Sequence, residues 1–224
     1  MRPVRKVQPI SRHKQTRKWI TALLAIFLIA ILSTVAYLSY STSKPASSQL
    51  TNELNSMPAG FKTLAENYLG VMDNLNSGQT KAKMAALLDS KYNQTELFAW
   101  EKSKLTFAND PNGFYEDPFQ ILASGDGICV QWSIVYVAAC LALGYQSRLV
   151  VAVDTSNWSY IHVWAEDYYN GNWVHVDPSD GVWGHPLMYQ GSSWGWGKYI
   201  GSMVRIYAFD DNSFQDVTAT YSSH

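Results

Sequence analysis

Three side chains in the second half of the chain have the chemistry of a thiol-based acyl-transfer site: Cys129, His162 and Asp177. A thiolate can attack an amide carbonyl, an imidazole can take up and deliver the proton, and a carboxylate can hold the imidazole in one tautomer. The order Cys, His, Asp is weak evidence alone, because unrelated proteins contain it by chance. The elements that carry these residues therefore decide whether they can meet.

Cys129 stands near the start of a strongly apolar segment, residues 128–143, which we predict to be a helix with Asp126 as its N-cap and Gly144 beyond its end. Unpaired N–H groups and the positive end of the helix dipole favour a thiolate at that start. Cys140 lies in the same helix about 16 Å away, too far for a disulfide, and is expected to be a small apolar core residue.

His162 and Asp177 fall on two predicted strands joined by Asn170-Gly171, a strong signal for a two-residue hairpin turn. A type I′ turn there makes His162 and Asp177 diagonal neighbours on one face, with backbones about 7 to 8 Å apart. Two side chains can close that gap. The opposite face should pack on the core because its residues are all apolar: Ile161, Val163, Ala165, Val174 and Val176.

The sequence around the three residues forms three ordered blocks within residues 127–180. The first contains Gly127, Cys129 and Trp132 and ends with Leu143, Gly144 and Arg148; the second is His162, Val163, Trp164 and Glu166; the third is Trp173, Asp177 and Pro178. These blocks resemble the signatures of the transglutaminase-like superfamily, and particularly of its peptide:N-glycanase branch.

The resemblance implies a papain-like core in which Cys129 is the nucleophile, His162 the general base and acid, and Asp177 the orienting carboxylate. It implies no cofactor. The paired-cysteine zinc ligands of cytosolic peptide:N-glycanases are missing from the sequence, as are the length and the acidic loops that flanking β-domains and calcium sites would need. We therefore expect no metal, and the family's substrate cannot be carried over.

Four tryptophans are candidates for substrate contact, because aromatic faces bind sugars and extended peptides: Trp164, Trp183, Trp194 and Trp196. Plain packing is the alternative for each of them. Arg148 is expected in a buried ion pair, and Glu166 is expected to be a structural partner. The second donor of an oxyanion hole has no clear candidate in the sequence.

Hydrophobic periodicity predicts an α+β domain over residues 59–224. A helical lead-in is expected at residues 61–75, 80–88 and 94–107. Antiparallel strands are expected at residues 147–153, 160–169, 172–177 and 203–209. Residues 41–58 are rich in Ser, Thr and Asn without an apolar period, and are predicted to be a linker.

The N-terminal part has the pattern of a membrane anchor. Residues 19–40 are 22 uncharged residues, enough for a helix that crosses a bilayer. Seven of the 17 Lys and Arg lie in residues 1–18, which predicts a basic tail in the cytoplasm and the large domain outside. A cleaved signal peptide is the alternative, although the region after the apolar stretch is a poor cleavage site.

The remaining residues, 19–224, carry 10 basic against 18 acidic side chains, a net charge of −8 that argues against nucleic acid as a partner. The combined expectation is a membrane-anchored, extracytoplasmic thiol enzyme acting on amide bonds of a protein, peptide or glycopeptide substrate. A protease-like hydrolase is placed first, then a crosslinking transglutaminase, then a glycopeptide amidase. A tethered binding module without turnover is the alternative from another class.

Overall fold

The computed structural model describes residues 47–108, 113, 116–186 and 203–222, within a compact unit formed by residues 46–224. This unit begins earlier than residue 59, where the start of the domain was predicted. Ser47–Ser56 form helix α2, in which Leu54 is buried against the core. The prediction of a linker over residues 41–58 is therefore wrong for this helix. Helix α2 has only one apolar residue per turn, so its sequence shows no clear hydrophobic periodicity.

Along the chain most helices come before most strands, as predicted. The helices after α2 are α3 (Ala59–Asn76), α4 (Gly78–Ala85), α5 (Gln94–Lys102), α6 (Pro118–Ser124), α7 (Cys129–Ala142) and α8 (Thr218–Ser222). The strands are β1 (Thr106–Phe107), β2 (Asp126–Gly127), β3 (Ser147–Asp154), β4 (Ser159–Tyr169), β5 (Asn172–Asp177), β6 (Val182–Pro186), β7 (Val204–Asp210) and β8 (Ser213–Asp216). Helix α6 lies in a stretch for which neither a helix nor a strand was predicted.

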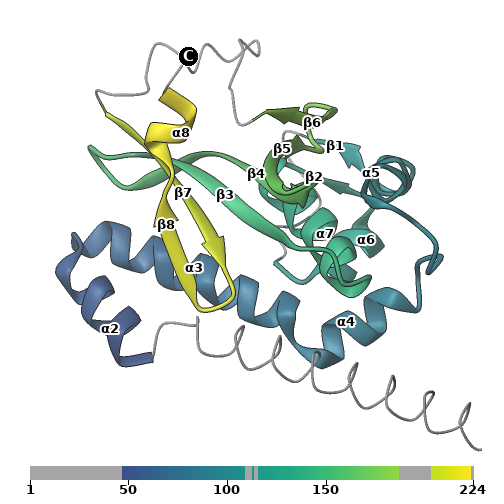
Figure 1. The fold of residues 1–224 in the computed structure, drawn as a ribbon, viewed down its shortest axis with the longest axis horizontal. Helices are drawn as coiled ribbons and strands as arrows, with labels where there is room; N and C mark the ends of the chain where they lie inside the picture. Colours follow the sequence, from purple (N-terminus) through teal and green to yellow (C-terminus); the bar gives the residue numbers. More distant parts are fainter. Residues whose placement is uncertain (1–46, 109–112, 114–115, 187–202, 223–224) are drawn as a thin grey trace, which may run out of the picture. The chain divides into compact units, whose positions relative to one another are not determined.

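The larger sheet has six antiparallel strands in the order β6-β5-β4-β3-β7-β8 (Figure 1). Helix α7 packs on one face of it, against β3 and β4, and α3 lies beside α7 against β7. Almost every residue of α7 is buried, which explains why its sequence is apolar on all sides. The α+β architecture predicted from the sequence is confirmed.

The hairpin between β4 and β5 has the predicted register. Tyr169 pairs with Asn172 and Ala165 with Val176. Asn170 and Gly171 take φ angles of 50° and 84°, the left-handed conformation that a type I′ turn requires. This turn therefore sets which side chains of the two strands share a face.

The two faces of the sheet differ from the prediction in one respect. Val163, Ala165 and Val176 pack in the main core as expected. Ile161 is 44% exposed, because the β3–β4 register shifts at this point and leaves Ile161 as the extra residue of a bulge. The other face is also covered. A second, smaller apolar cluster forms there between the sheet and α8: Val150, Ala152, Trp164, Val204, Ile206, Ala208, Val217 and Tyr221.

None of the helices that the structure describes between residues 47 and 222 has the length and apolar character needed to cross a bilayer. The predicted cytoplasmic tail (residues 1–18) and membrane span (residues 19–40) lie outside the described residues, as do Trp194 and Trp196.

Candidate active site

Cys129 is the first residue of α7 and is partly exposed. The N-cap is Ile128, not Asp126 as predicted, because Asp126 belongs to strand β2. Gln131 fixes the N-cap residue: its side-chain oxygen accepts a hydrogen bond from the Ile128 backbone N–H at 3.1 Å, and its Nε2 donates to the Gly113 carbonyl at 2.9 Å. The residue before Cys129 is thus held in place, while no side chain among the described residues caps the N–H groups of the first turn of α7.

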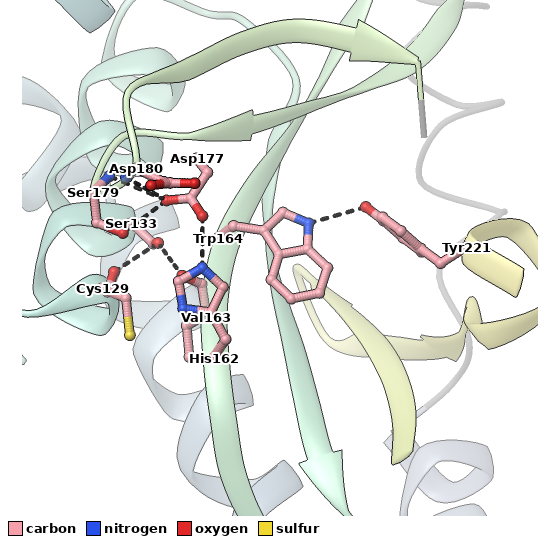
Figure 2. A network of polar contacts seen from close by, with 9 residues as sticks. All are labelled: Cys129, Ser133, His162, Val163, Trp164, Asp177, Ser179, Asp180 and Tyr221. Carbon is pink, nitrogen blue, oxygen red and sulfur yellow. Dashed lines mark hydrogen bonds and ion pairs between the residues drawn. The ribbon is translucent and has the colours of Figure 1, made fainter. Parts of the chain in front are cut away.

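One serine ties the start of α7 to the sheet. The Ser133 hydroxyl lies 2.8 Å from the Cys129 carbonyl oxygen and 3.1 Å from that of Val163, so it bridges the helix and strand β4 (Figure 2). Val163 is the neighbour of His162. The backbone that carries the thiol and the backbone that carries the imidazole are therefore fixed relative to each other through a single side chain.

The imidazole of His162 is held by a carboxylate. His162 Nε2 lies 2.5 Å from Asp177 Oδ2, and both side chains are buried. The other oxygen of Asp177 accepts hydrogen bonds from the Ser179 N–H and hydroxyl and from the Asp180 N–H. The Cys129 side chain lies beside the ring on the side away from Asp177 (Figure 2). The imidazole thus stands between carboxylate and thiol.

The electrostatics favour a charged imidazole. Burial alone would lower the pKa of His162, but hydrogen bonds with Asp177 and Cys129, together with their charges, raise it to about 10. Burial would raise the pKa of Asp177, but the bond with His162 and its charge hold it below its usual value. At neutral pH the site therefore holds an imidazolium between the Asp177 carboxylate and the Cys129 sulfur.

Trp164 packs behind the imidazole. The two rings are stacked with centroids 5.7 Å apart, and Trp164 is only 1% exposed. Its indole N–H donates to the Tyr221 hydroxyl at 2.9 Å (Figure 2). A side chain so covered has no surface left for a substrate, so the predicted contact is replaced by a packing role. The physical reason is α8, which the sequence analysis did not anticipate and which closes this face.

A buried ion pair supports the same region. Arg148 Nε donates to Glu166 Oε2 at 2.7 Å, and the Tyr221 hydroxyl donates to Glu166 Oε1 at 2.6 Å. The Arg148 guanidinium also lies 3.9 Å from the centre of the Trp173 ring. The ion pair expected for Arg148 and the structural role expected for Glu166 are both present.

The structure brings Cys129, His162 and Asp177 into one site, as the spacing predicted. Trp183 lies on β6 opposite Val176, and its side chain is not described. Sequence reasoning missed Gln131, Ser133 and Tyr221. Polar residues inside an otherwise apolar helix were the available signal for the first two; for Tyr221 there was none. No cluster of His, Cys, Asp or Glu among the described residues could hold a metal ion.

A helix-borne cysteine facing a histidine and an aspartate on an antiparallel sheet defines the papain-like class of thiol enzymes. Residues 75–178 match the family model described as "Transglutaminase-like superfamily". The chain is 33% identical over 106 residues to a rice (Oryza sativa subsp. japonica) protein named "Peptide-N(4)-(N-acetyl-beta-glucosaminyl)asparagine amidase", and 31% identical over 153 residues to the human protein of that name. Residues 75–178 therefore form a transglutaminase-like core similar to that of the peptide:N-glycanases, and the resemblance predicted from the sequence blocks is confirmed.

These matches cover 46% and 65% of this chain but only 21% of each relative. The likeness therefore concerns the core domain and not the remaining parts of those longer proteins. Among solved structures, a chain in the crystal structure of Rad4-Rad23 crosslinked to an undamaged DNA is similar with a TM-score of 0.55 and 12% identity, over 80% of this chain and 50% of the other. At that identity the comparison supports the fold alone.

Proposed function

We propose that this protein is a membrane-anchored, extracytoplasmic thiol hydrolase that cleaves amide bonds through an acyl-enzyme on Cys129. The observation that carries the proposal is the His162 imidazole held between Asp177 and Cys129 at the start of α7. A binding module has no need of this arrangement, because it serves proton transfer to and from a thiol.

In the first half-reaction the Cys129 thiolate attacks the carbonyl carbon of the amide. The negative charge that develops on the carbonyl oxygen is stabilised by N–H groups at the start of α7. His162 then gives its proton to the amide nitrogen, the C–N bond breaks, and the amine leaves a thioester on Cys129. Asp177 keeps the imidazole oriented and stabilises its charged form.

In the second half-reaction His162 takes a proton from a water molecule, and the hydroxide attacks the thioester carbonyl. The C–S bond breaks, a carboxylic acid leaves, and the sulfur and the imidazole return to their starting state. An amine in place of water would give a new amide by the same steps. Hydrolysis is preferred here because no part of the described site is built to exclude water in favour of an amine.

The test is the reactivity of the two cysteines of the full-length chain towards iodoacetamide, followed residue by residue with mass spectrometry. Cys129 should be alkylated readily at pH 6.5. His162→Ala should slow this by roughly ten-fold or more, because an adjacent charge shifts such an equilibrium by one or more pH units. Cys140 is an internal control: burial, and then the charge of Asp167, raise its pKa well above the usual value, so it should stay unmodified.

Asp177→Asn should reduce turnover by about 10² to 10⁴-fold while changing alkylation much less, because Asp177 acts through the imidazole. Equal alkylation of Cys129 in the wild type and in His162→Ala would show that the thiol and the imidazole are not coupled. The catalytic proposal would then be abandoned in favour of the binding module.

A glycopeptide amidase is the second candidate, and the names of the relatives favour it. Cleavage of a glycosylated asparagine side chain would follow the same steps and leave an aspartate. Incubation of the protein with a glycosylated peptide and its unglycosylated counterpart separates the two. Release of the glycan with conversion of Asn to Asp would support the amidase, and cleavage of the backbone would support the protease-like hydrolase.

A further inference from the structure

A cavity of about 500 Å³ lies between α3, the first turns of α7 and the turn that joins β3 to β4. Val130, the residue after Cys129, forms part of its wall. Burial, and then the charge of Cys129, raise the pKa values of Tyr68 and Tyr160, which also line the cavity. The cavity is therefore within electrostatic reach of the thiol. Its volume lies within the roughly 300 to 1,000 Å³ typical of small-molecule sites.

Three aromatic side chains line the cavity: Tyr68, Trp158 and Tyr160. Trp158 is held rigidly. Its backbone has a φ of 58°, its N–H donates to the Asp154 carbonyl at 2.7 Å, and its ring packs edge-on against Phe61. It also lies so close to Gly60 that a Cβ added there would come within 2.9 Å of the indole. The aromatic wall is thus preformed.

The polar groups of the cavity select for positive charge. Tyr68 is 4% exposed and its hydroxyl has no hydrogen-bond partner among the described residues, so it remains available to a ligand in the cavity. Glu116 lines the same cavity and is held by a hydrogen bond of 3.1 Å from Asn67 Nδ2 to one of its oxygens. No described lysine or arginine lines the cavity. A carboxylate beside aromatic faces attracts cations through charge and through the ring quadrupoles.

We propose that this cavity is a specificity pocket for a basic side chain of a peptide substrate, next to the amide that Cys129 attacks. The aliphatic stem packs against Tyr68, Val71 and Trp158. The charged end pairs with Glu116 and donates a further hydrogen bond to the Tyr68 hydroxyl oxygen. A neutral sugar could donate hydrogen bonds to Glu116 but would gain no charge pairing, and an acidic side chain would be repelled by it. This inference rests on the proposed function, since it gives a substrate class to the same site.

The experiment measures protection of Cys129 in the full-length chain. Nα-acetyl-lysine N-methylamide and its norleucine counterpart share the same stem and differ in the terminal charge. The rate at which iodoacetamide alkylates Cys129 is measured at increasing concentrations of each compound, at pH 6.5 and low salt. The lysine compound should halve the rate at a concentration roughly three- to ten-fold lower than the norleucine compound, the range expected for a partly exposed ion pair.

Two variants test the contribution of the terminal charge and that of the aliphatic stem to binding separately. Glu116→Gln should abolish most of the preference for lysine and leave the norleucine titration unchanged. Gly60→Ala should weaken both compounds alike, because the added methyl group displaces Trp158. Glu53→Gln, which removes an exposed carboxylate from α2, is the matched control and should change neither titration.

Three outcomes would overturn the proposal that the cavity binds a basic side chain. They are equal protection by the two compounds, no protection by either, and a lysine preference that survives Glu116→Gln. These outcomes are distinct from failure of the proposed function. The rate without any ligand, and its dependence on His162, report on the thiol and the imidazole alone. The pocket can therefore fail while the thiol chemistry stands.

Discussion

At the scale of single residues, the protonation of each buried titratable group depends on the groups that surround it. His162 keeps its proton because its interactions with Asp177 and Cys129 outweigh the cost of burial. Glu101 on α5 shows the opposite case. It is fully buried, neither of its carboxylate oxygens has a hydrogen-bond partner in the part of the chain that the structure describes, and its charged form is disfavoured.

The raised pKa of His162 predicts a specific pH dependence of stability. The usual value is 6.5 and the folded value about 10, so the folded state binds a proton that the unfolded state loses between these values. The stabilisation by His162 should be complete below about pH 6.5 and lost as the pH rises towards 10. Urea unfolding of wild type and His162→Ala at several pH values measures it; a difference that does not shrink across this range would contradict the prediction.

For Glu101 we predict that replacement by glutamine stabilises the protein. Burial, and then the charge of Asp177, raise the pKa of Glu101 well above its usual value, so folding above pH 4.5 requires a proton to be taken up at a cost. Glu101→Gln removes that cost, and the melting temperature should rise by a few degrees, more at pH 8 than at pH 5. Glu96→Gln on the same helix is the control and should give no such rise, because Glu96 is exposed and a glutamine oxygen can still accept the Asn93 N–H hydrogen bond of the N-terminal capping box.

At the scale of elements, the short C-terminal helix α8 closes the face of the sheet opposite α7. Figure 1 shows α8 and α3 on opposite sides of β7. Tyr207 and Phe209 of β7 pack with α3 in the main core, while Ile206 and Ala208 point to the cluster that contains Tyr221. Because Trp164 lies between Tyr221 and His162, this helix supports the back of the imidazole.

We predict that Tyr221→Phe costs about 1 to 3 kcal/mol of stability. The substitution keeps the ring but leaves a buried indole N–H and a buried carboxylate oxygen without their partner. Chemical denaturation measures the loss. The control is Tyr145→Phe, which removes a hydroxyl that donates only to the Tyr92 carbonyl at a partly buried position and should cost about 1 kcal/mol or less. Equal effects of the two variants would show that the Tyr221 network adds nothing.

At the scale of the whole molecule, the basic tail and the apolar stretch predict that the thiol domain lies outside the cytoplasm. Protease added to intact cells, or to spheroplasts if a wall intervenes, should digest the domain while a cytoplasmic marker survives. A domain that resists until the cells are lysed would reverse this orientation. A domain released by a high-salt wash without detergent would contradict the anchor.

Much of the site could be predicted from the sequence because its parts are local. The Asn170-Gly171 turn sets the register of two neighbouring strands, and the register alone puts His162 and Asp177 on one face. Cys129 could be assigned to a helix start because the apolar run begins there. Such features depend on residues close together in the chain, whose geometry follows from backbone sterics and periodicity.

The tertiary structure alone decided what surrounds the three residues. Trp164 carries a pattern that suits a substrate contact, but α8, more than fifty residues further along the chain, buries it. Helix α2 has too narrow an apolar face to be recognised, and Ser133 looks like any other helical serine until β4 lies beside it. Long-range packing combines weak local preferences into one arrangement, and no window of sequence contains the partners that determine it.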